Sequence, residues 1–345
     1  MAISKPIIAY FSHDSFKHHT EPMLTPEILR SLSINKRPIG QILWAQFLRF
    51  NYWFSSTKIT VEGLENLPQD RQVCIAMNHT DRFNYFPFQF HLYEKRNQFT
   101  SSWVKGKYYE NTFSRIFLMN TNNIPLASRG YVISTMFKKE LGRAPTTQEY
   151  RYIRDIWNQR DTDSIEKFLD LSPQCRSFLK PTVSHRIEEL EQTFKALSEE
   201  VVRLSEESLK QGHHILVFPE GTRSVQLLKG HTGLAQMSQR MGIDIIPVGC
   251  NSSHLCYPGD FPWAQKGHIV YRVGAPITLN GKELGKLRVE ESFTPFSTLA
   301  QERYGQRFQS ITDIVMEHIS ELLDPIHQPS SSTDPSGPQG SERFI

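Results

Sequence analysis

The sequence lacks any long hydrophobic run. No stretch of its 345 residues reaches the roughly 20 apolar residues that a bilayer-spanning helix needs. The first residues also lack the apolar core and the cleavage site of a secretory signal peptide. These two absences predict a protein that is not translocated and has no spanning helix.

Cysteine is scarce as well. The chain has four cysteines, Cys74, Cys175, Cys250 and Cys256, and no Cys-x-x-Cys pair. This pattern is typical of a reducing compartment rather than of a disulfide framework. His254 lies between two of these cysteines, but the spacing matches no common zinc pattern, so no metal is expected.

An excess of charge of one sign is the third absence. Lys and Arg total 39 and Asp and Glu total 36, which leaves a formal net charge of +3. Nucleic-acid binding needs a concentrated basic excess, so no nucleic-acid partner is predicted. Aromatic residues, in contrast, are plentiful, with 22 Phe, 12 Tyr and 5 Trp. They suit a large core, an apolar ligand site or a membrane interface.

Several of these aromatic residues lie in one segment, at positions 42–54. Its apolar residues follow helical spacing, and we expect an amphipathic helix over residues 39–57 that is too short to cross a bilayer. One interpretation is a helix lying in the membrane interface, with lipid contacts from Trp44, Phe47, Phe50 and Trp53. The other is a helix packed on its own domain, which the same pattern supports equally.

Short apolar runs alternate with helical patterns through the rest of the chain. This order predicts an α/β fold, a single domain with a central, mostly parallel sheet covered by helices. We expect an N-terminal arm over 1–38, the main domain over 58–326 with a helical insertion at about 137–180, and a disordered tail over 327–345. The expected strands are 58–65, 73–77, 102–105, 124–127, 214–218, 243–249 and 268–273.

Polar, reactive residues follow two of these strands. Beyond the first, His79 is a candidate general base, because imidazole exchanges protons near neutral pH. Asp81 and Asn84 are the local candidates to orient it, provided that His79 lies in the turn before the next helix. The alternatives are a structural histidine at 79 and a helix N-cap at Asp81.

The second polar segment, 218–224, has the residues of an anion clamp. Gly221 allows close backbone approach, Thr222 adds a hydroxyl, and the Arg223 guanidinium is a planar fork for a phosphate. Glu220 would orient Arg223 or bind a substrate hydroxyl. The alternative is an ordinary strand-exit turn with a surface ion pair.

These segments resemble the glycerolipid acyltransferases, whose best-known members are the 1-acyl-glycerol-3-phosphate (lysophosphatidic acid) acyltransferases. Four blocks match in order: Asn-His at 78–79, Ile-Pro-Leu-Ala-Ser-Arg-Gly at 124–130, Phe-Pro-Glu-Gly-Thr-Arg at 218–223 and Ile-Pro-Val-Gly at 246–249. The third block matches the family at every position. The lead-in at 61–68 also resembles the family, and the likeness extends over about 59–277, the insertion excepted.

The resemblance implies an O-acyltransferase. A fatty acyl group would pass from acyl-CoA or acyl-carrier protein to a lysophospholipid hydroxyl, with 1-acyl-glycerol-3-phosphate as acceptor and phosphatidic acid as product. His79 would be the general base, and no cofactor or metal would be required. The protein would be peripheral or monotopic on the cytoplasmic face of a membrane. The acceptor would be held by Arg129, Glu220, Gly221, Thr222 and Arg223, and Pro247 would lie in the block beside the acyl site. Weaker candidates, better explained as surface charges, are Arg82, Lys105 and Lys229.

The chain departs from the family pattern in two ways. Asn84 stands where the family has Asp, and an amide stabilises an imidazolium less well than a carboxylate does. The insertion separates the first and third blocks more widely than in compact relatives. Two alternatives therefore stay open: another acceptor (glycerol 3-phosphate, a different lysophospholipid or an amino-acid lipid), or a non-catalytic lipid-binding protein on this fold.

Overall fold

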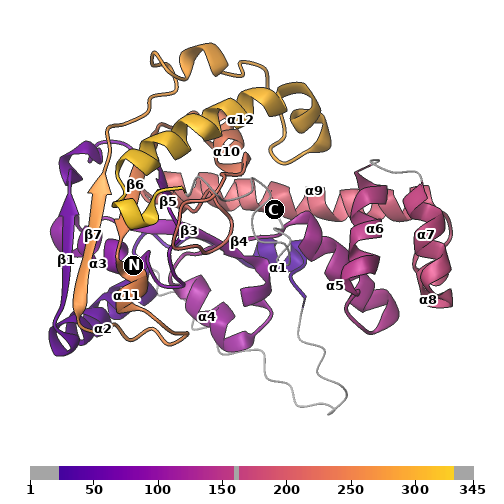
Figure 1. The fold of residues 1–345 in the computed structure, drawn as a ribbon, viewed down its shortest axis with the longest axis horizontal. Coiled ribbons are helices and arrows are strands. Elements are labelled where there is room, and N and C mark those ends of the chain that lie inside the picture. Colours follow the sequence, from indigo (N-terminus) through magenta and orange to yellow (C-terminus); the bar gives the residue numbers. More distant parts are fainter. Residues whose placement is uncertain (1–22, 159–162, 330–345) are drawn as a thin grey trace, which may run out of the picture.

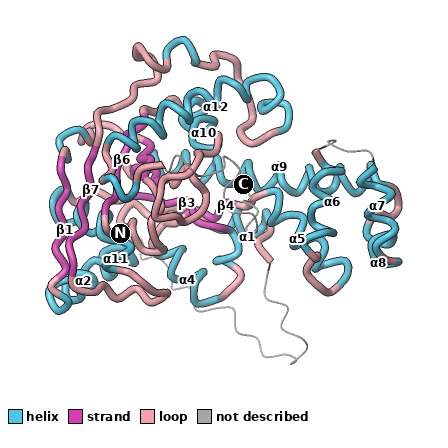
Figure 2. The backbone as a smooth tube through the Cα atoms, viewed as in Figure 1, coloured by secondary structure: helices cyan, strands magenta, loops and turns pink. Residues whose placement is uncertain are grey.

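A computed structural model describes residues 23–158 and 163–329. Its centre is a seven-stranded sheet with the strand order β1-β7-β6-β2-β5-β3-β4. Helices surround this sheet and extend well beyond its β4 edge (Figures 1 and 2). The strands are β1 Thr57–Glu62, β2 Cys74–Met77, β3 Thr100–Lys105, β4 Ile124–Leu126, β5 His214–Val217, β6 Ile245–Asn251 and β7 Gly267–Val273.

All neighbouring strands run parallel except β6 and β7, which are antiparallel. Each expected strand coincides with an observed one to within a few residues at its ends. The predicted fold class, a mostly parallel sheet covered by helices, is confirmed. Parallel order brings the carboxyl ends of β2, β5, β3 and β4 to one edge of the sheet, where ligands of α/β proteins usually bind.

Alternating side chains of the central strands enter two different hydrophobic clusters. Cys74 and Ala76 of β2 belong to one cluster, and Ile75 and Met77 belong to the other. All four side chains are fully buried. The centre of the sheet therefore has apolar packing on both faces, which explains why β2 is a continuous apolar run in the sequence.

Helices of different parts of the chain cover the two faces. Residues of α9, α10 and α12 pack on one face, and residues of α2 and α3 pack on the other. The helices are α1 Pro26–Ser31, α2 Ile39–Ser55, α3 Phe86–Arg96, α4 Thr112–Asn120, α5 Arg129–Leu141, α6 Thr147–Trp157, α7 Asp163–Leu171, α8 Pro173–Phe178, α9 Val183–Lys210, α10 Gly233–Met241, α11 Ser253–Cys256 and α12 Thr298–Glu321. Short 3-10 turns are η1 Leu64–Asn66, η2 Gly106–Tyr109, η3 Gly285–Leu287 and η4 Pro325–His327.

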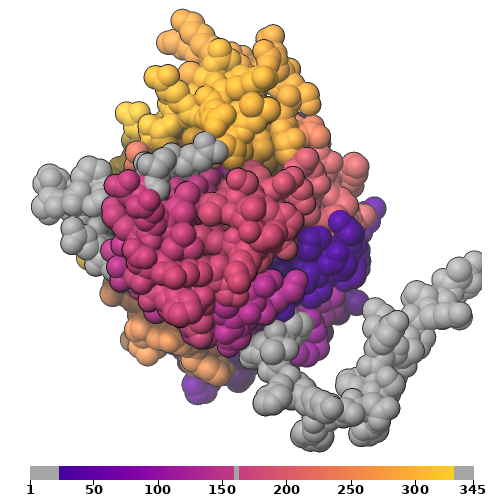
Figure 3. Space-filling model, turned by 90° about the vertical axis from the view of Figure 1, so that its right-hand side faces the viewer, coloured from indigo at the N-terminus to yellow at the C-terminus, as the bar shows by residue number. Residues whose placement is uncertain are grey.

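The segment expected as a helical insertion, 137–180, contains the end of α5 followed by α6, α7 and α8. Thr146 and Glu149 form a capping box that starts α6. These helices lie at the end of the molecule away from β1, against α5 and the first half of α9. Figure 3 faces that end of the molecule and shows it as one continuous surface of magenta to pink residues below the yellow C-terminal part of the chain.

The two chain ends are only partly described. The arm expected over 1–38 contributes α1, while its residues 1–22 lie outside the described residues. The tail expected over 327–345 lies outside them from residue 330 onward. Within the described part, every helix is too short or too polar to cross a membrane.

Candidate active site

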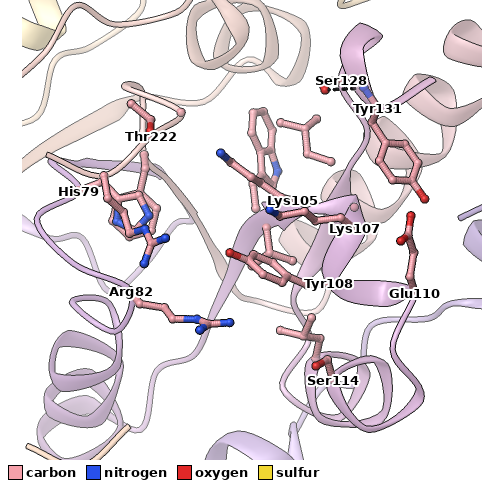
Figure 4. Close-up of a pocket in the computed structure, with 18 of the residues that line it drawn as sticks. His79, Arg82, Lys105, Lys107, Tyr108, Glu110, Ser114, Ser128, Tyr131 and Thr222 are labelled. Carbon is pink, nitrogen blue, oxygen red and sulfur yellow. Dashed lines mark hydrogen bonds between the residues drawn. The ribbon is translucent and has the colours of Figure 1, made fainter. Parts of the chain in front are cut away.

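A large cavity lies beyond the carboxyl ends of the parallel strands. It has a volume of about 880 Å³ and is lined by residues that follow or end β2, β3, β4 and β5. In Figure 4, His79 and Thr222 lie on one side and Glu110 and Tyr131 on the opposite side, with Lys105 and Lys107 between them. The walls are mostly apolar: Phe83, Phe86, Trp103, Val104, Phe113, Phe117 and Leu126.

His79 lies in the turn between β2 and α3. This is the position in which a residue a few places further along the chain can hydrogen-bond its imidazole. Its Nδ1 is 3.1 Å from Oδ1 of Asn84, and its ring stacks on Phe218 with centroids 4.0 Å apart. The imidazole is thus held from one edge and one face. The remaining nitrogen, Nε2, is left for the cavity that His79 lines.

The tautomer of His79 follows from the other bonds of Asn84. The Asn84 Nδ2 donates to the carbonyl oxygen of Asn78 at 2.8 Å, so its Oδ1 is the atom that faces the imidazole. An amide oxygen only accepts hydrogen bonds, so Nδ1 of His79 carries the proton and Nε2 is unprotonated. This is the form of histidine that accepts a proton from a hydroxyl at Nε2.

The backbone of His79 is tied to the second polar segment. Its N–H donates to Glu220 Oε1 at 2.7 Å, and its carbonyl accepts from the Ser224 N–H at 2.8 Å. The other oxygen of Glu220 accepts from the Leu228 N–H at 2.9 Å, and the Glu220 side chain is fully buried. Glu220 therefore joins the two loops behind the cavity rather than lining its wall.

The environment of His79 favours the neutral ring. Burial lowers its pKa to about 4 despite the hydrogen bond that its Nδ1–H donates to Asn84, and the positive charges of Arg223 and Lys105 lower it further. At neutral pH the imidazole is uncharged and its Nε2 is free to accept a proton. A buried base flanked by cations is an arrangement that functional sites often contain.

Cationic side chains contribute to the wall of the cavity. Arg82, Lys105, Lys107 and Arg223 line it. Burial lowers the pKa of Lys105, and the neighbouring Lys107 and Arg223 add to this effect. Several cations that repel one another in a cavity form a binding site for an anion, because an anionic ligand neutralises them.

The second polar segment contributes three of its predicted binding residues to the cavity wall: Gly221, Thr222 and Arg223. Gly221 has φ of +62°, and its N–H donates to the Phe218 carbonyl at 3.0 Å. This left-handed turn suits glycine and brings the next two side chains to the cavity.

Two other predicted binding residues lie elsewhere. The Arg129 guanidinium donates hydrogen bonds to Asn158 at 2.8 Å and to Thr298 at 2.5 Å, and it lies over the Trp157 ring. The residues next to it in the sequence, Ser128, Gly130 and Tyr131, line the cavity. Pro247 is in the middle of β6, opposite Ala76 of β2.

The structure also gives Asp81 a different setting from the one expected. Its Oδ1 accepts from the Phe83 N–H at 2.8 Å, and its Oδ2 accepts from the Thr80 hydroxyl at 3.0 Å. Burial raises its pKa. Asp81 shapes the turn by bonding a backbone N–H two residues ahead, and the place beside the imidazole belongs to Asn84. This geometry does not support a catalytic role for Asp81.

Sequence reasoning undervalued Lys105 and missed the far end of the cavity. Lys105 ends β3, and only the parallel order of β3 and β5 brings it near Arg223. At the far end, the Tyr131 hydroxyl accepts from the Leu24 N–H at 2.9 Å, and Glu110, Ser134, Thr135 and Lys138 contribute further polar groups. Among the described residues of the expected insertion, 137–158 and 163–180, Lys138 and Ala144 line the cavity. Lys229, in contrast, is exposed and does not line it.

The cysteine and histidine residues near β6 have a structural setting. Burial raises the pKa of Cys250 to about 12 and that of Cys256 to about 11, so both are neutral thiols at physiological pH. Within residues 23–158 and 163–329, no group of three or more His, Cys, Asp or Glu side chains is placed to hold a metal ion.

Comparison with known proteins agrees with the motif blocks. A family model described as Acyltransferase matches residues 58–251, more than half of the chain and all of the loops described above. The chain belongs to the acyltransferase family. Among solved structures, this acyltransferase is similar to the 1-acyl-sn-glycerophosphate (LPA) acyltransferase PlsC from Thermotoga maritima, with a TM-score of 0.43 and 14% identity over 82% of this chain and 79% of that one. No curated protein matches this acyltransferase in sequence.

Proposed function

We propose that this acyltransferase moves a fatty acyl group from an acyl thioester, acyl-CoA or acyl-carrier protein, to the free hydroxyl of a lysophospholipid. The proposed acceptor is 1-acyl-glycerol-3-phosphate and the product is phosphatidic acid. One observation carries the proposal: a neutral, oriented His79 faces a cavity that combines a group of cations with long apolar walls. A lysophospholipid with a phosphate and an acyl chain has the same two chemical parts.

His79 would act as general base and then as general acid. Its Nε2 takes the proton of the acceptor hydroxyl while the oxygen attacks the thioester carbonyl, which forms a new C–O bond and a tetrahedral intermediate. When the C–S bond breaks, the leaving thiolate takes the same proton back from the imidazolium. Proton and electrons balance without an acyl-enzyme. Asn84 keeps the ring in the required tautomer throughout.

The cations would position the acceptor. Arg223 and Lys105 both affect His79 electrostatically, so a phosphate bound to them lies next to the base. A guanidinium binds phosphate through two parallel hydrogen bonds, which fixes orientation as well as affinity. Thr222 is beside Arg223 on the same wall and supplies a hydroxyl. Holding acceptor and base in this geometry supplies the positioning part of catalysis.

The proposal includes peripheral membrane attachment through α2. This helix buries Ala45, Leu48 and Tyr52 and leaves Phe50 and Trp53 exposed at 54% and 75%. Trp44 and Phe47 are half-buried, and the Trp44 ring packs on Phe86 and Phe117. The helix thus packs on its own domain and also offers an apolar face, so Phe50 and Trp53 are the better placed of the four residues for contact with lipid.

The test is thiol release from a long-chain acyl-CoA with and without lysophosphatidic acid, for the wild type and His79→Gln. We expect release that depends on the acceptor and falls at least about 100-fold in the variant, the usual contribution of a general base. His268→Gln is the matched control, because His268 is an exposed histidine on β7 that does not line the cavity. Release unaffected by His79→Gln would refute the proposed mechanism. Lipid binding without release from any acyl-CoA or carrier-protein donor would support the non-catalytic alternative.

A further inference from the structure

Helix α4 exposes an apolar face of its own. Phe113 is 85% exposed, and Ile116 and Met119 follow at intervals of three residues on the same side of the helix. The Asn111 side chain caps the start of this helix, so Phe113 lies in a well-formed first turn. Apolar side chains gathered in this way on a surface usually mark a binding site.

The loop that follows α11 exposes a second apolar group. Phe261 is 71% exposed at its tip. Two residues later, the Trp263 ring packs against Phe47, Phe50 and Phe54 of α2, with centroids 5.9 to 6.3 Å apart. The loop is therefore fastened to the exposed side of α2.

These elements form one surface. Trp44 of α2 and Phe117 of α4 are in ring contact at 5.1 Å, and α2, α4 and the loop after α11 all lie along the lower edge of the molecule in Figure 1. We call this the mouth surface. Its exposed apolar members are Leu43, Phe50, Trp53, Phe54, Phe113, Ile116 and Phe261.

The mouth surface borders the opening of the cavity. Phe113 and Phe117 of α4 line the cavity, and so do Asp260 and Pro262 of the loop. Arg82 pairs with Asp260 at 3.2 Å and thereby links the loop to the turn that carries His79. Arg82 and Lys107, which line the cavity, supply cationic groups. A ligand that enters between α4 and the loop passes this apolar surface first.

We propose that the mouth surface docks on a lipid bilayer, with α4 and the 257–263 loop inserting beside α2. Aromatic tips with nearby cations suit the boundary between anionic headgroups and acyl chains. Three separate elements that surround one opening suit a broad, fluid surface better than a single partner helix. The inference rests on the proposed function in one respect, the lipid nature of the substrate. Docking there lets a lysophospholipid pass from the bilayer into the cavity without crossing water.

The experiment measures insertion site by site. All four native cysteines are buried, so a thiol-reactive environment-sensitive dye is directed to a cysteine introduced on the surface. Phe113→Cys and Phe261→Cys are labelled and mixed with vesicles of phosphatidylglycerol and phosphatidylethanolamine. The control is Leu299→Cys at the start of α12, which is also an exposed apolar position, 57% exposed, on an element at the opposite edge of the molecule in Figure 1.

We expect a blue shift at positions 113 and 261 on addition of vesicles, quenching by brominated acyl chains, and no change at position 299. Phe113→Gln should lower the vesicle partition coefficient about tenfold, because the variant loses the favourable transfer of one aromatic side chain from water into an apolar environment. Leu299→Gln should leave the partition coefficient unchanged. The proposal is overturned if the dyes at positions 113 and 261 keep the emission of an aqueous environment in the presence of vesicles. It is also overturned if a concentration-dependent dimer, detected by light scattering and lost in Phe113→Gln, covers the surface instead.

Vesicle binding needs no turnover, and thiol release from a water-soluble short-chain donor and acceptor needs no vesicle. An enzyme that is active in solution but does not insert α4 would contradict the docking proposal alone. A protein that inserts α4 but never releases thiol would contradict the proposed function alone.

Discussion

The side-chain amide of Asn84 donates a hydrogen bond to the backbone carbonyl of Asn78 across 2.8 Å, and both residues are buried. Its oxygen is therefore the atom 3.1 Å from His79 Nδ1. The turn is adapted to an amide, because a carboxylate at position 84 would face the Asn78 carbonyl with a second acceptor. The hydrogen-bond partners around position 84 thus fit the asparagine that stands where the family has aspartate.

Asn84→Asp is accordingly expected to lower activity rather than restore a stronger dyad. An ionised carboxylate would lose the bond to Asn78 and leave two acceptor oxygens in contact without water, which costs about 1–3 kcal/mol or more. We expect kcat to fall about tenfold at pH 7 and to recover partly at lower pH, where the carboxyl is protonated. Asn84→Ala, which loses both bonds, serves as reference. An activity above wild type in Asn84→Asp would contradict this account.

The pH dependence should reveal the low basicity of His79. Its folded pKa is about 4, so the base form is present above about pH 5 and is lost as the pH falls through the pKa. The kcat/KM of the free enzyme should be flat from pH 8 to about 5 and fall below that. An acid limb near the ordinary histidine value of about 6.5 would show that the ring is more basic than its surroundings indicate.

A bound phosphate should change that profile. The positive charges of Arg223 and Lys105 lower the pKa of His79, and an anionic acceptor neutralises both. The pKa of His79 in the complex should therefore be higher, so the acid limb of kcat lies at higher pH than that of kcat/KM. The same comparison in Lys105→Met should show a smaller difference between the two limbs. If the acid limbs of kcat and kcat/KM lay at the same pH in the wild type, the phosphate would bind away from His79.

Removing one cation should weaken acceptor binding selectively. In Lys105→Met and Arg223→Met we expect the KM for lysophosphatidic acid to rise about tenfold, because a charge-assisted hydrogen bond to phosphate is lost. A neutral acceptor such as a monoacylglycerol should be affected little. Lys229→Met is the control, since Lys229 is exposed and does not line the cavity. If Lys229→Met raised the KM as much as Lys105→Met, the phosphate would bind elsewhere.

Glu220→Gln tests whether Glu220 positions His79 or binds substrate. The carboxylate accepts from the N–H groups of His79 and Leu228, and glutamine retains one acceptor and points an NH₂ at the other donor. We expect kcat to fall about tenfold with the KM for the acceptor nearly unchanged, and the free energy of unfolding to fall by about 1–3 kcal/mol. Chemical denaturation and steady-state kinetics measure the two effects. A large rise in KM at constant kcat would instead identify Glu220 as a substrate ligand.

Much of the candidate site is local and was therefore predictable. His79 and Asn84 lie five residues apart in one turn, and Gly221, Thr222 and Arg223 are consecutive, so short-range geometry brings each group together. The central strands were predictable for a related reason. β2, β5 and β6 are buried along their whole length, and such burial on both faces of a sheet favours a continuous apolar run in the sequence.

The remaining features depended on contacts between distant parts of the chain. Strand order brought Lys105 near Arg223, and the packing of α5 against α6 places Arg129 beside Asn158 and Trp157 at the end of α6. Glu220 reaches back 141 residues to His79, and Trp263 packs on α2 from more than 200 residues away. The sequence by itself determined the strands, the dyad and the anion loop, because neighbouring residues make them. Only the tertiary structure decided which charges share a cavity and which apolar side chains share a surface, because those contacts depend on where packing brings remote segments together.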